Sequence, residues 1–226
     1  MIPLRDTIPS RHPPFMTISM IAACTVAFLY TVNLPPAAAN RLFLSYGLIP
    51  ARVLTMDFTG GMRFLSFFSS MFLHGNWGHL LSNMWALWLF GDNIEDRMGS
   101  FRFLLFYLAG GAAAGLVHVF TNPLETAPAI GASGAVAGVM GAYFLLYPTA
   151  RIVTLVPIFF FPLFIRIPAF FYLGGWFLLQ LIQGTAAFLG VSSAGGIAWW
   201  AHVGGFVTGM FVVRRFLLRS RRFYQN

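Results

Sequence analysis

A serine and two histidines stand in apolar stretches of this sequence, where such side chains are rare. Ser133 lies in AIGASGAVAGVMGAYF and His202 in AWWAHVGGFVTGM, while His79 and Asn83 share HGNWGHLLSNMW. A histidine beside a serine can take the hydroxyl proton, which makes the serine a nucleophile. His79, Asn83 and the backbone N–H of Ser133 are suitable donors to the oxyanion that such an attack creates. Catalysis therefore depends on whether the fold brings these residues together.

The composition indicates that lipid surrounds these residues. Only 9% of the 226 residues are charged and 58% are hydrophobic, whereas a soluble domain carries about 25% charged residues. Helical runs of roughly 20 apolar residues match the hydrocarbon core of a bilayer. We predict an all-α polytopic membrane protein, a bundle of six transmembrane helices at about 15–34, 77–91, 101–120, 130–147, 168–189 and 197–213. The whole chain, 1–226, is predicted to form a single membrane domain.

The remaining segments are predicted to be tails and connectors. Residues 1–14 and the basic residues 214–226 read as tails. The apolar run 151–167 contains two prolines and is bracketed by arginines, so we predict an interfacial or re-entrant connector rather than a seventh span. A cleaved signal peptide ending near Ala37–Ala39 is the alternative to a retained first span, and the length of the apolar run favours retention.

Arginine placement predicts the topology. The net charge of +8 comes from arginine alone, because the chain has no lysine. With a cytoplasmic N-terminus, eleven arginines fall in inside segments and only Arg41, Arg52 and Arg63 outside. Inside loops carry the excess of positive charge, so both termini are predicted to be cytoplasmic. The basic tail reads as an anchor on anionic lipid and not as a nucleic-acid site.

This topology places the polar groups at one depth. The second, fourth and sixth spans all run from outside to inside, and each carries its polar group in its first two turns. Small residues at Gly134 and Gly138 and at Ala201, Gly205 and Gly209 let two helices approach closely. If these stripes face each other, Ser133 and His202 come within hydrogen-bond range. No acidic residue is expected inside the bundle, so a dyad is predicted rather than a triad.

Four motifs together resemble the bacterial rhomboid family of intramembrane serine proteases. They are HGNWGHLLSN at 74–83, GDNIEDRMG at 91–99, GASG at 131–134 and AHVGG at 201–205. The resemblance covers about 62–213, which is the expected core. It implies a six-helix rhomboid-like bundle in which the first loop, 35–73, lies partly in the membrane.

The resemblance also implies a role for each matching residue. Ser133 would be the nucleophile and His202 its general base and acid, with His79, Asn83 and Gly131 at the oxyanion hole. His74 would be structural, Arg63 would belong to the first loop, Glu95 to the loop after the second span, and 184–198 to a cap over the site. Ala137 stands where many members carry an aromatic ring against the histidine. Trp199, Trp200 and Phe206 are the candidate replacements.

Three functions compete at this stage. The first is an endopeptidase that cuts transmembrane segments of other membrane proteins near their outer end, in a cell's inner (plasma) membrane. The second is an inactive rhomboid-like protein that binds membrane proteins, and the third is a haem protein that uses His79 and His202. The first is favoured because both dyad residues are present. No cofactor or metal ion is expected, since the chain has one cysteine and no HExxH motif, and the sequence predicts no oligomeric state.

Overall fold

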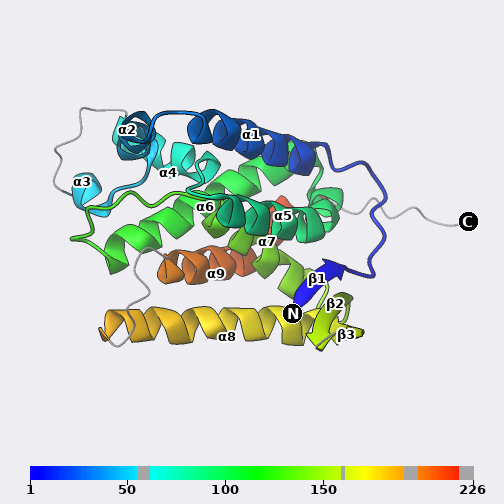
Figure 1. The fold of residues 1–226 in the computed structure, drawn as a ribbon. Coiled ribbons are helices and arrows are strands. Elements are labelled where there is room, and N and C mark those ends of the chain that lie inside the picture. The colour runs from blue at the N-terminus through cyan, green and yellow to red at the C-terminus, as the bar shows by residue number, and fades with distance from the viewer. Residues whose placement is uncertain (55–61, 159–160, 191–197, 219–226) are drawn as a thin grey trace, which may run out of the picture.

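A computed structural model describes residues 1–54, 62–158, 161–190 and 198–218. The chain is mostly helical (Figure 1). Its helices are α1 (Phe15–Val32), α2 (Pro36–Tyr46), α3 (Pro50–Leu54), α4 (Met62–Ser69), the 3-10 helix η1 (Ser70–Phe72), α5 (Trp77–Met98), α6 (Ser100–Thr121), α7 (Ser133–Leu146), α8 (Ala169–Phe188) and α9 (Trp199–Phe216). Helices α1 and α8 lie on opposite sides of the bundle, with α6, α7 and α9 between them.

Each of the six predicted apolar stretches coincides with one long helix. These are α1, α5, α6, α7, α8 and α9. Helix α5 continues to Met98, seven residues beyond the predicted end of the second span. Among the described residues, α1 and α6 are long and apolar enough to cross a membrane. The helices are therefore confirmed, whereas six membrane crossings remain a prediction.

The prediction of an all-α chain is wrong for residues 151–167. Strands β2 (Arg151–Ile158) and β3 (Phe161–Pro168) form an antiparallel hairpin, and β1 (Ile2–Arg5) pairs with β2. Proline inside a helix loses a hydrogen bond and clashes with the preceding turn, and β-branched residues such as Ile152, Val153 and Thr154 favour strands. The connector 151–167 is therefore part of a sheet. Its position at the membrane interface stays a prediction.

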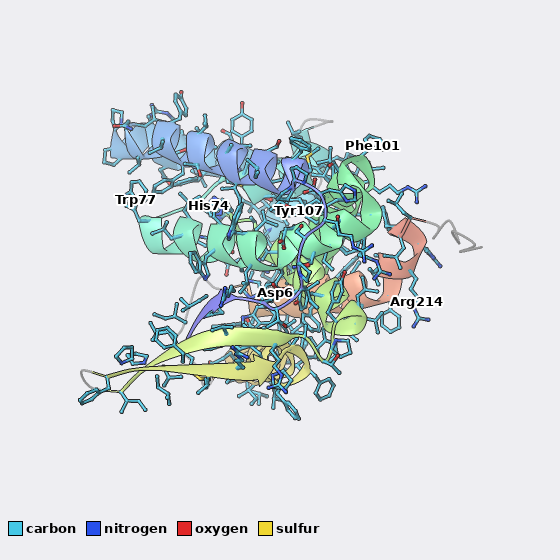
Figure 2. The ribbon with its side chains drawn as sticks, turned by 90° about the vertical axis from the view of Figure 1, so that its right-hand side faces the viewer. Asp6, His74, Trp77, Phe101, Tyr107 and Arg214 are labelled. Carbon is cyan, nitrogen blue, oxygen red and sulfur yellow. The ribbon has the colours of Figure 1, made fainter. Side chains whose placement is uncertain are left out.

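The N-terminal segment is fixed across the same end of the bundle. Trp85 Nε1 donates to the carbonyl of Pro3 at 2.6 Å, and the Asp6 carboxylate accepts from Tyr143 and from Asn93. Asp6 lies between β1 and the helices in Figure 2. Burial raises the pKa of this carboxyl, and the hydrogen bond from Tyr143 acts in the opposite direction. Residues 2–6 thus pack against the helices and β2, and the cytoplasmic position of residues 1–14 stays a prediction.

The predicted first loop, 35–73, contains four short helices in its described part. These are α2, α3, α4 and η1, and residues 55–61 lie outside the described residues. Arg63 is the second residue of α4, and its side chain also lies outside the described part. The depth of this loop in a membrane stays a prediction.

Helices α7 and α9 touch through their backbones. A Cβ added at Gly138 would lie 3.4 Å from the carbonyl oxygen of Gly205, and one at Gly209 would overlap the carbonyl of Gly138. A Cβ at Gly134 would lie 4.0 Å from the carbonyl oxygen of Ala201. The two predicted small-residue stripes therefore face each other. This close approach fixes the first turn of α7 against the first turn of α9.

Glu95 is not in a loop and is not near the serine. It lies in the last turn of α5, sixteen residues after His79, which is about 24 Å along a helix at 1.5 Å per residue. Its carboxylate accepts from the backbone N–H groups of Met16 and Thr17 at 2.8 Å each, and from the hydroxyls of Thr17 and Ser100. A helix start leaves such N–H groups without partners. Glu95 therefore joins the end of α5 to the starts of α1 and α6.

Candidate active site

Ser133 and His202 are in direct contact. Ser133 is the first residue of α7 and His202 the fourth of α9. The His202 Nε2 atom lies 2.8 Å from Ser133 Oγ. At this distance an imidazole can take the hydroxyl proton and later return it to a leaving group. The juxtaposition expected from the sequence is present.

His79, Asn83 and Gly131 meet beside this pair. Asn76 caps α5 by accepting from the backbone N–H of His79 at 2.9 Å, and this fixes His79 in the first turn. A Cβ added at Gly131 would lie 2.5 Å from His79 Nε2 and 3.7 Å from Asn83 Nδ2. Gly131 also has a φ of 125°, a conformation that favours glycine. Its own N–H donates to Ser70 at 2.9 Å, so Gly131 shapes the site and offers no oxyanion donor.

Two donors beside Ser133 are free to meet developing negative charge. The buried Asn83 Nδ2 has no hydrogen-bond partner among the described residues. Ser133 occupies the first position of α7, where a backbone N–H has no partner within the helix and the helix dipole favours negative charge. The described residues therefore place an unpartnered amide donor near Gly131, two residues before Ser133, and a free helix N–H at Ser133 itself.

A small cavity adjoins the serine on the side facing α6. Its volume is about 50 Å³, and Ser133, Gly131, Ser70, His118 and Met71 are among its lining residues. A cavity of this size and polarity holds a few water molecules, since each needs about 10–15 Å³. Hydrolysis needs such water next to the serine. The predicted cap, 184–198, cannot be compared as a whole, because residues 191–197 lie outside the described residues.

His74 and Ala137 occupy supporting positions. His74 is buried, and its ring meets that of His79 edge-on at a centroid distance of 5.1 Å. Ala137 is buried one turn after Ser133 on α7. The aromatic contact expected at this position comes instead from Trp176, whose ring centroid is 5.9 Å from that of His202, and from Trp199 at 6.3 Å.

Of the three predicted replacements for that ring, only Trp199 contacts His202 directly. Trp200 donates to the carbonyl of Gly184 at 3.2 Å. Phe206 packs against Trp176 at 6.0 Å and so acts behind it. Trp176 was not predicted from the sequence, because nothing in the sequence indicated which face of α8 turns toward α9.

Gln180 is a further site residue that the sequence reasoning missed. Its side chain is buried, and its Oε1 atom lies 2.8 Å from Nδ1 of His202. A carboxylate is the usual third group beside a serine and a histidine, and Gln180 carries a neutral amide instead. The signal in the sequence was the amide of Gln180 in the middle of the apolar run 168–189, where a polar side chain often marks a functional residue.

Residues 62–219 match the Rhomboid domain, which is 158 of the 226 residues. The chain belongs to the rhomboid family. Rhomboid-like protein 11, chloroplastic, of Arabidopsis thaliana is 40% identical over 113 residues, which are 50% of this chain and 39% of that protein. Rhomboid protein 1, mitochondrial, of Saccharomyces cerevisiae is 34% identical over 96 residues, 41% of this chain and 28% of that protein.

Bacterial rhomboids are similar as well. Rhomboid protease GluP of Bacillus subtilis is 44% identical over 75 residues, 33% of this chain and 14% of that protein. In all three relatives the chain spans less than half of the relative's length. These matches support the rhomboid family and not its bacterial branch in particular. The rhomboid domain, with the two long apolar helices α1 and α6, indicates a membrane protein.

Proposed function

We propose that this rhomboid is an intramembrane serine endopeptidase that cuts transmembrane segments of other membrane proteins near their outer end. Ser133 is the nucleophile, and His202 is the base in the attack and the acid toward the leaving amine. Asn83, His79 and the backbone N–H of Ser133 stabilise the oxyanion. Gly131 leaves space for the substrate backbone, and His74 supports the ring of His79.

One observation carries this proposal. The 2.8 Å contact between Ser133 Oγ and His202 Nε2 lies beside an amide donor, Asn83 Nδ2, that has no partner among the described residues. A buried polar atom without a partner costs free energy, and an acceptor on a bound group would remove that cost at Asn83 Nδ2. A tetrahedral oxyanion on the serine supplies that acceptor.

The same contacts weigh against the two alternatives. An inactive rhomboid-like binding protein has no need for a hydrogen-bonded serine and histidine next to a free oxyanion donor. A haem protein needs a free ring nitrogen on His202, but Ser133 and Gln180 occupy both nitrogens. One relative that is named as a protease, Rhomboid protease GluP, supports an enzymatic function.

The distribution of arginines supports an orientation in the membrane. We propose six membrane crossings in the inner (plasma) membrane, with both termini in the cytoplasm and the serine near the outer face. The excess of eleven arginines over three supports this orientation. Substrates then enter from the bilayer, and a helix must unwind locally to present a peptide bond to Ser133.

The test compares wild type with Ser133→Ala and His202→Ala in detergent. Wild type should react with a fluorophosphonate probe and cleave a transmembrane substrate, and both variants should lose labelling and cleavage. Ser133→Ala adds no bulk and removes one hydrogen bond. Such a bond contributes about 0.5–1.5 kcal/mol, so the melting temperature should fall by no more than about 6 °C. A Ser133→Ala protein that still cleaves contradicts the proposal.

A further inference from the structure

Gln180 is the one buried polar residue of α8. The other buried residues of this helix are Ala169, Leu173 and Gly184. A buried amide lowers stability unless its polar atoms are hydrogen-bonded. Gln180 makes two such contacts: its Oε1 atom meets His202 Nδ1 at 2.8 Å, and its Nε2 atom donates to the carbonyl of Trp176 at 3.3 Å.

The second contact determines which way the amide faces. A backbone carbonyl only accepts hydrogen bonds, so the atom of Gln180 next to the Trp176 carbonyl must be the NH₂ nitrogen. The amide oxygen therefore faces His202. An amide oxygen only accepts, so Nδ1 of His202 must carry the hydrogen. In the neutral ring the lone pair is then on Nε2, the atom that faces Ser133.

From this geometry we propose that Gln180 is a positioning residue that holds His202 in the Nδ1–H tautomer, with its basic nitrogen toward the serine. The inference rests on the proposed function for its catalytic consequence. In serine hydrolases with a carboxylate in this place, the carboxylate selects the tautomer and also stabilises the imidazolium. Here a neutral amide selects the tautomer without adding a charge to the bundle.

One turn of α8 supplies both the hydrogen bond and the ring contact. Trp176 and Gln180 are four residues apart, so they lie on the same face of the helix. The Trp176 ring lies against His202 with an interplanar angle of 34°, and Trp199 meets it at 87°. The two rings restrict the plane of the imidazole, and Gln180 fixes its direction within that plane.

The proton transfers of the proposed reaction balance with a neutral amide, Gln180, beside Ser133 and His202. As Ser133 Oγ bonds to the substrate carbonyl carbon, its proton moves to Nε2 of His202. The resulting imidazolium carries N–H on both nitrogens, and Gln180 Oε1 accepts from Nδ1–H throughout. When the C–N bond breaks, the proton on Nε2 goes to the leaving amine. Gln180 gains and loses no proton.

The test uses three variants of the full chain in detergent. Gln180→Leu keeps a similar volume but removes the acceptor, and Gln180→Glu restores an acceptor at the same place. Gln183→Leu is the matched control, since Gln183 lies on the same helix and is half-buried. Cleavage of a transmembrane substrate gives kcat and KM, and ¹⁵N NMR of histidine-labelled protein reports which ring nitrogen of His202 is protonated. The ¹⁵N signals of His202 are those that are present in the wild-type spectrum and absent from the spectrum of His202→Ala.

Gln180→Leu should lower kcat by about 10- to 10,000-fold. The upper bound is the loss of kcat in serine proteases whose tautomer-selecting carboxylate has been replaced. KM should stay within about twofold, because the substrate site is unchanged. Gln180→Glu should recover most of kcat, and Gln183→Leu should match wild type. In wild type the ¹⁵N spectrum should show hydrogen on Nδ1 of His202, and in Gln180→Leu a mixture of tautomers.

An unchanged kcat in Gln180→Leu, or hydrogen on Nε2 of neutral His202 in wild type, overturns the inference. If Gln180→Leu does not fold, the wild-type tautomer still decides. If wild type neither reacts with the probe nor cleaves a substrate, the proposed function fails, while the NMR measurement still tests what Gln180 does to His202.

Discussion

Asn83 allows the oxyanion hole to be tested without disturbing the fold. Its Nδ2 atom has no partner among the described residues, so Asn83→Ala removes an oxyanion donor without breaking a hydrogen bond of that atom. We expect kcat to fall by about 10- to 1,000-fold, because a single donor contributes up to that amount in other serine hydrolases and two donors remain. The measurements are kcat and melting temperature, with Asn33→Ala at the exposed end of α1 as control. A normal kcat in Asn83→Ala would remove this residue from the site.

Residues of the site could be predicted where chemistry alone marks them. Ser133, His202 and Asn83 stand out because polar groups are rare in apolar helices, and their positions in the predicted spans led us to expect them at one depth. Gln180 and Trp176 could not be assigned, since their role depends on the rotation of α8 about its axis. That rotation is set by packing against α9, and the amide of Gln180 in an apolar run was a local signal that did not show which helix it faces.

Glu95 connects elements, and its removal should destabilise the protein without touching the serine. In Glu95→Ala the N–H groups of the second and third residues of α1, Met16 and Thr17, lose their acceptor, and so do the hydroxyls of Thr17 and Ser100. We expect the free energy of unfolding to fall by about 2 kcal/mol or more, because each buried group left without a partner costs about 1–3 kcal/mol. Thermal unfolding in detergent measures this, with probe labelling of Ser133 retained at low temperature.

Asp96, the next residue along α5, provides the control for Glu95→Ala. Asp96 pairs with the exposed His12, so Asp96→Ala should cost at most about 1 kcal/mol. Equal losses in the two variants would show that Glu95 does not hold the start of α1.

The elements themselves could be predicted where periodicity is strong. All six apolar runs are helices, because their length and composition have few other solutions in an apolar chain. The hairpin of β2 and β3 could not be predicted, since its pairing with residues 2–5 joins segments about 150 positions apart. Pro157 and Pro162 gave the relevant signal: they disfavour a helix and face each other across the hairpin.

At the scale of the whole molecule, the orientation in the membrane can be tested with two single cysteines. Cys24 is buried in α1, so Cys24→Ala provides the background. Leu124→Cys lies in the connection between α6 and α7 and Phe161→Cys in the hairpin, and the native side chains are 89% and 79% exposed. In spheroplasts of a bacterial host, a membrane-impermeant maleimide should label Leu124→Cys and spare Phe161→Cys.

Detergent solubilisation should then expose Phe161→Cys to the same reagent. The opposite pattern in intact spheroplasts would reverse the topology, and with it the face from which water reaches Ser133.

The contacts of the N-terminal segment impose an order on the making of the molecule. A ribosome completes residues 2–5 first, yet the strand that pairs with them includes Leu155, and Asp6 needs Tyr143. Before those residues are synthesised, the N-terminal segment can contact only α5, through Trp85 with Pro3 and Asn93 with Asp6. The oldest part of the nascent chain therefore completes its contacts late. A chain that stalls before β2 has residues 2–5 without a partner strand.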